Sequence, residues 1–109
     1  MTRGELVAWM RSRYATVCEW GKTVRAEIFD NGWSYADPVS RNHCVLNDSI
    51  QSYLRTLDRF LVGYTQEDPA EPCNPTHEEI VMRGFSNLER QYRARPKLYK
   101  KAKPIPSLW

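Results

Sequence analysis

The last twenty residues of the chain, 90–109, contain no acidic side chain. They carry seven of the 16 lysines and arginines, which leaves nine cations against all 13 anions in residues 1–89. The formal net charge of +3 therefore combines an acidic body, at −4, with a C-terminal segment at +7. Because runs of like charge are typical of interaction tails, this segment is the first candidate for a binding surface.

Long apolar runs are also missing. No stretch approaches the ~18 consecutive apolar residues of a membrane span, and residues 1–5 do not begin a signal peptide with an apolar run and a cleavage site. The three cysteines, Cys18, Cys44 and Cys73, are an odd number without the spacing of a disulfide framework, which fits a reducing compartment. We expect a cytoplasmic protein with no membrane partner.

Residue patterns typical of catalysis are scarce. The five glycines are scattered, so none of them forms a phosphate-binding loop, and the chain has only two histidines. The adjacent Glu78 and Glu79 suit the start of a helix, where the helix dipole favours anions. We therefore predict a protein that is not an enzyme and that has no cofactor and no metal.

A zinc site remains the alternative to this metal-free prediction. Cys73 and His77 have an acceptable spacing for two zinc ligands. His43 and Cys44 are adjacent, so their side chains diverge and form a poor pair. The other interpretation is that the thiols pack as small apolar side chains and that both histidines lie at the surface.

Helical periodicity is clearest at the start of the chain. The sequence predicts a helix over 3–29, begun by a capping box of Thr2 and Glu5 and followed by a left-handed cap at 30–32. Its apolar positions step by three and four residues, as a packed helix requires: Val7, Met10, Tyr14, Val17, Gly21, Val24 and Ile28. We expect a bend or break near Gly21, or alternatively a close approach by another helix there.

A second helix is predicted over 47–64, after a loop at 31–44 that has no apolar period. Asn47 or Asp48 is the expected N-cap. The apolar positions again follow helical spacing: Leu46, Ile50, Tyr53, Leu54, Leu57, Phe60, Leu61 and Tyr64.

The third helix follows an acidic linker at 65–75, whose three prolines exclude a helix interior. Thr76 as N-cap and Glu79 form the expected capping box, and Pro96 ends the helix. The apolar positions are Val81, Phe85, Leu88 and Tyr92, flanked by Ile80 and Met82.

The predicted fold is therefore an all-α, small three-helix bundle with long connecting loops and an extended basic C-terminal tail. The bundle domain covers 1–95 and the tail covers 96–109. Connections of about 14 and 11 residues are too long for the three- or four-residue turn of a helix-turn-helix, so recognition of DNA through that motif is not expected.

The leading functional hypothesis is a small regulatory protein whose basic C-terminal segment contacts DNA, RNA or a protein of a nucleic-acid-processing complex. Cations neutralise phosphates, and aromatic rings stack on exposed bases. The expected contacts are Arg90, Arg93, Arg95, Lys97, Tyr99, Lys100, Lys101 and Lys103.

A protein-binding inhibitor or adaptor is the alternative, for example a phage- or mobile-element-encoded factor that blocks a host or defence complex. It would use the acidic linker and exposed aromatic residues, with Trp109 as an anchor in the partner's pocket. The residues of this interface would be Trp33, Tyr35, Glu67, Asp68, Glu71 and Trp109. Two further alternatives are a homodimer completed through the helix seams and a tail that folds back onto the acidic body.

Overall fold

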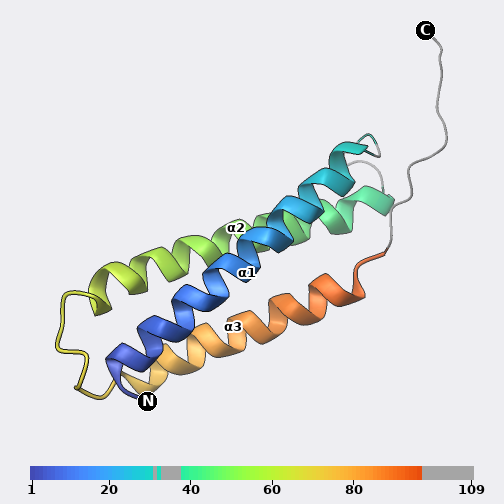
Figure 1. The fold of residues 1–109 in the computed structure, drawn as a ribbon. Coiled ribbons are helices and arrows are strands. Elements are labelled where there is room, and N and C mark those ends of the chain that lie inside the picture. The colour runs from blue at the N-terminus through green and yellow to red at the C-terminus, as the bar shows by residue number, and fades with distance from the viewer. Residues whose placement is uncertain (31, 33–37, 97–109) are drawn as a thin grey trace, which may run out of the picture.

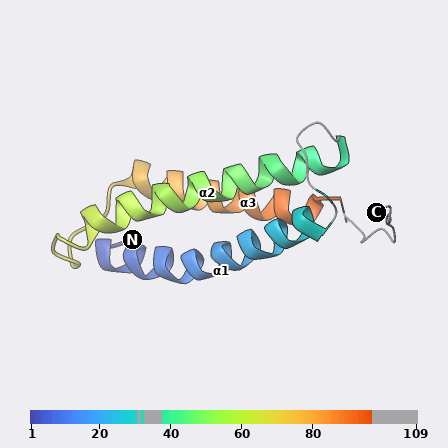
Figure 2. The same ribbon diagram turned by 90° about the horizontal axis from the view of Figure 1, so that it is seen from above.

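The computed structural model describes residues 1–30, 32 and 38–96. They form three helices, α1 (Arg3–Asp30), α2 (Pro38–Tyr64) and α3 (Pro75–Ala94), and no strand occurs within these ranges. Each helix runs antiparallel to the one before it in an elongated bundle (Figure 1). Seen from above, α1 lies on one side of the bundle and α2 and α3 overlap on the other (Figure 2). In the first view α1 passes between the other two helices (Figure 1). The all-α, three-helix prediction is thus confirmed.

Helix α1 is continuous over its 28 residues, about 42 Å at 1.5 Å per residue. The capping box is confirmed, because the Thr2 N–H donates to Glu5 Oε1 at 2.8 Å and the Glu5 N–H donates to Thr2 Oγ1 at 3.1 Å. We expected a bend or a break near Gly21, and the helix is not broken there. A Cβ at Gly21 would lie 3.4 Å from Ile50 Cγ2, so this glycine serves the alternative that we considered, close approach of a second helix.

Helix α2 begins at Pro38 rather than near residue 47. The prediction of a loop through residue 44 is therefore wrong, and so is the assignment of Asn47 or Asp48 as N-cap. Proline suits the first turn of a helix because its missing N–H has no helical acceptor there and its φ is already helical. The left-handed residue expected after α1 is present at Gly32, whose φ is 68°.

Helix α3 is capped by Asn74 and not by Thr76, which corrects the third helix start. The Asn74 side-chain oxygen accepts from the Thr76 N–H at 2.8 Å, and Pro75 occupies the first turn. At the other end Arg95 is extended, with a ψ of 142°, as expected for a residue before proline.

The core follows the predicted apolar positions closely. Fully buried side chains come from all three helices, with α1 and α2 supplying most of them: Leu6, Met10, Val17, Val24, Ile50, Leu57 and Val81. In the described part of the chain, no helix has both the length and the apolar character that crossing a bilayer demands.

Candidate functional site

Helix α3 ends beside the end of α1 and the start of α2 (Figure 1). Arg90 and Arg93 belong to the last turns of α3. Arg93 is 73% exposed, and its Nη2 lies 2.9 Å from Glu89 Oε2, one turn earlier. Arg90 is also exposed and donates to Asn87 Oδ1 at 2.9 Å. Both contacts are exposed contacts on the helix surface, where such pairs contribute little stability. The two guanidinium groups therefore remain accessible to a partner.

Arg95 is held quite differently. Its Nε and Nη2 donate to the two carboxylate oxygens of Glu27, at 2.8 and 2.7 Å, and its Nη1 donates to the Tyr92 carbonyl at 2.7 Å. The guanidinium also lies over the Tyr92 ring, 4.1 Å from its centroid. These hydrogen bonds lower the pKa of Glu27 and raise that of Arg95. Arg95 thus joins the end of α3 to α1.

His43 completes this cluster and is fully buried, although the sequence placed it in a surface loop. That expectation fails because α2 starts at Pro38, which carries His43 onto the inner face of a helix. His43 Nε2 lies 3.0 Å from Glu27 Oε1. A carboxylate only accepts, so Nε2 carries the proton. Nδ1 is buried without a hydrogen-bond partner.

Four partly buried aromatic rings connect α1 to α3 below the cluster. Trp9 meets the edge of Phe85 at 5.7 Å between ring centroids, and Trp20 stacks on Phe85 at 5.2 Å and on Tyr92 at 5.0 Å. Such pairs add about 0.5–1.5 kcal/mol each beyond their buried area. These four rings therefore fix the basic end of α3 against α1.

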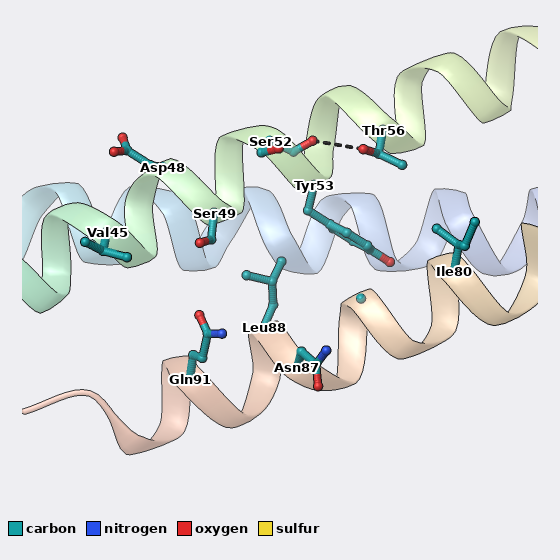
Figure 3. Close-up of a pocket in the computed structure, with 11 residues that line it drawn as sticks. Val45, Asp48, Ser49, Ser52, Tyr53, Thr56, Ile80, Asn87, Leu88 and Gln91 are labelled. Atoms are coloured by element: carbon teal, nitrogen blue, oxygen red, sulfur yellow. Dashed lines mark hydrogen bonds between the residues drawn. The ribbon is translucent and has the colours of Figure 1, made fainter.

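A groove of about 490 Å³ opens between α2 and α3, on the side away from α1 (Figure 3). Tyr53 and Leu88 project into it, and the Tyr53 hydroxyl donates to the Val81 carbonyl at 2.6 Å. Burial raises the pKa of this phenol, so it stays protonated. The rim consists of hydroxyl and amide side chains from both helices: Ser49, Ser52, Thr56, Asn87 and Gln91.

The acidic linker lies at the opposite end of the bundle and is fixed to the start of α1. The Arg3 and Gly4 N–H groups donate to the carbonyls of Glu71 and Pro69, at 2.8 and 3.0 Å. The Glu67 carboxylate lies 2.9 Å from Arg3 Nε. Asp68 accepts from the Ala70 N–H at 2.9 Å, within the linker. Three of the predicted protein-binding residues are described, Glu67, Asp68 and Glu71, and all three are exposed. Glu67 is paired with Arg3.

The four candidate zinc ligands do not converge. His77 lies beside Tyr64 at the end of α2, with 2.7 Å between its Nδ1 and the Tyr64 hydroxyl. Cys44 lies near the start of α2, about 30 Å away at 1.5 Å per residue. Cys44 and Cys73 are buried, and burial raises the pKa of both thiols. No cluster of three metal-binding side chains occurs among the residues that the structure describes.

Several predicted site residues lie outside the described part of the chain. They are Trp33, Tyr35, Lys97, Tyr99, Lys100, Lys101, Lys103 and Trp109.

Comparison of the chain with models of known protein families, with curated protein sequences and with solved structures found no match.

Proposed function

We propose that the protein binds nucleic acid, or a complex assembled on nucleic acid, through the basic end of α3 and the residues that follow it. Lysine and arginine neutralise phosphates and release counterions, so such binding depends on charge density and not on a catalytic centre. The observation that carries the proposal is that Arg90 and Arg93 stand exposed on a helix directly before four lysines, with no anion from residue 90 onward.

Arg95 has a separate role in this proposal. To bind a phosphate it would have to leave two hydrogen bonds with Glu27 in a partly buried site, which is costly. We therefore assign phosphate contact to Arg90, Arg93 and the lysines at 97, 100, 101 and 103, with Tyr99 stacking on a base. Arg95 fixes the point from which the basic segment leaves the bundle.

Arg93→Gln tests the proposal, and Arg83→Gln is its matched control. Both arginines are exposed on α3 and both pair with a glutamate one turn earlier, Glu89 and Glu79 respectively. Only Arg93 lies at the basic end. We expect Arg93→Gln to weaken binding to a short DNA duplex and to reduce the salt slope by about 1, measured by fluorescence anisotropy. Equal effects of the two substitutions would count against the proposed contact surface.

Binding to a protein through the acidic linker is the second candidate function. The observation that favours it is the set of backbone hydrogen bonds from α1 that hold the linker in one shape. A fixed loop presents Glu71 and Asp68 at low entropic cost. Affinity purification from the native cell, with and without nuclease, separates the two functions. Partners kept after nuclease treatment but lost on Glu71→Lys would support the linker, with Glu19→Lys as an exposed control on α1.

A further inference from the structure

The groove between α2 and α3 reaches the point at which α3 ends. We call the part of the groove beside the end of α3 its upper part. Its lining includes Asn42, Leu46, Ala94, Arg95 and Pro96. Three residues line both this part and the main part below it: Val45, Ser49 and Gln91. The chain therefore leaves the bundle at the mouth of a continuous groove.

The chemistry of the groove suits an apolar segment of chain with its own backbone hydrogen-bonding groups. Two large aliphatic side chains, Val45 and Ile80, are exposed at the groove, by 51% and 48% respectively. Tyr53 and Leu88 form its floor between them (Figure 3). Among the described residues that line the main part, Asp48 is the only one with a charged side chain. The hydroxyls and amides on the rim are suitable partners for peptide N–H and C=O groups.

We propose that this groove is the docking site of the chain's own C-terminal segment, residues 97–109. The groove runs back along α3 from Pro96 to Ile80, about 24 Å at 1.5 Å per residue. Thirteen residues extend to about 43 Å at 3.3 Å per residue, which is enough to reverse direction and follow the groove. The segment ends in apolar side chains that can cover the exposed aliphatic ones: Ile105, Leu108 and Trp109.

The charge of the segment agrees with this arrangement. Its four lysines come first, between residues 97 and 103. They would pass the upper part of the groove first, at the carboxyl end of α3, where the helix dipole favours cations. From there they would approach Asp48, which lines the main part. The apolar residues come last and would reach the part of the groove floored by Tyr53 and Leu88. Docking would therefore place the lysines at the carboxyl end of α3 and the apolar residues on the apolar floor of the groove.

Docking also implies regulation, and this step rests on the proposed function. Lysines held along the groove are less available to phosphates, so nucleic acid must compete with the groove for the same segment. Apparent affinity falls in proportion to the population of the free form. If docked molecules outnumber free ones by about ten to one, a variant that cannot dock should bind DNA about tenfold more tightly.

Methyl resonances of the full-length protein test the docking directly. Trp109→Ala should shift the NMR methyl signals of Ile80 and Val45, because the ring current of the indole is lost. The signal of Val62, which is 61% exposed on α2 but does not line the groove, should stay in place. Ser107→Ala is the matched variant in the same segment and should leave all three signals unchanged.

Unchanged Ile80 and Val45 signals in Trp109→Ala would overturn the proposal. The groove would then be a candidate binding site for another protein. Signals that depend on protein concentration, together with a dimer in sedimentation, would assign the groove to a second copy and would also overturn it. These spectra need no nucleic acid, so the docking and the proposed function fail separately. If docking holds but no variant binds DNA or RNA, only the proposed function is lost.

Discussion

At the scale of single residues, the polar contacts at the basic end converge on Glu27. Its carboxylate accepts from two nitrogens of Arg95, the residue that caps α3, and from His43 Nε2, on α2. One side chain of α1 therefore joins all three helices. The hydrogen bonds from Arg95 and its charge outweigh the effect of burial and hold the pKa of Glu27 below its ordinary value of 4.5.

Glu27→Gln should lower the free energy of unfolding by about 2 kcal/mol at neutral pH, since it removes hydrogen bonds between charged groups. A carboxyl whose pKa is lowered by folding adds stability above its ordinary pKa and loses it as pH falls through the folded value. The difference between wild type and variant should therefore shrink below pH 4.5. Urea denaturation across a pH series measures both effects.

Glu19→Gln is the control for this substitution. Glu19 is on the same helix, but its pair with Lys22 is exposed, with 71% and 68% of the two side chains open to solvent, so its loss should change stability little. A Glu27→Gln effect no larger than that of Glu19→Gln would contradict the structural role of the cluster.

The sequence could not reveal this cluster. Glu27 and Arg95 are 68 residues apart, and no local pattern links them. The burial of His43 could have been predicted. A helix that starts at Pro38 extends the helical spacing of Leu46 and Ile50 back to His43. The neighbouring Ser40 and Asn42 concealed that signal, since serine and asparagine are common in loops.

At the scale of elements, two substitutions at the start of α3 test whether Asn74 or Thr76 is its N-cap. Asn74→Ala should lower the free energy of unfolding by about 1 kcal/mol, because the Thr76 N–H loses its acceptor. Thr76→Ala should change it by only a few tenths, since the Thr76 side chain is not the cap. Thermal unfolding of the two variants measures the difference. A larger loss of stability in Thr76→Ala than in Asn74→Ala would contradict the structure and support Thr76 as the N-cap.

Two helical glycines differ in the room around them. A Cβ at Gly63 would meet no atom within 4 Å, whereas one at Gly84 would lie 2.8 Å from Tyr53 Cε1. Gly63→Ala should stabilise the protein by about 0.5–1 kcal/mol through its helix propensity. Gly84→Ala has the same intrinsic gain but must displace the Tyr53 ring, so it should be destabilising. Similar midpoints for the two variants would contradict the close packing of α3 on Tyr53.

The elements themselves were largely predictable, because a buried helix face repeats every three or four residues. The spacing predicted every buried residue of α1 except Leu6, and it predicted the Val81 and Leu88 contacts of α3. The prediction of a break at Gly21 failed for a physical reason: a missing side chain can equally admit a neighbouring helix, and Ile50 fills that space. Local sequence does not distinguish the two uses.

At the scale of the whole molecule, opposite charges are separated along the bundle axis. The acidic linker lies at the start of α3 and the basic residues lie at its end, about 30 Å apart at 1.5 Å per residue. The sequence predicted both charged segments, but not their placement at opposite ends. Among the arginines of the basic segment that the structure describes, Arg95 contacts another helix, α1, rather than the acidic linker.

The salt dependence of nucleic-acid binding tests the central claim most directly. Six cations remain for phosphate contact once Arg95 is held by Glu27, so binding to duplex DNA should show a log–log slope of about −5. Anisotropy titrations of the full-length protein over a range of salt concentrations give this slope. A slope of about −5, reduced by about 1 in Arg93→Gln, is the predicted result. A slope near zero, or no binding at low salt, would contradict the account.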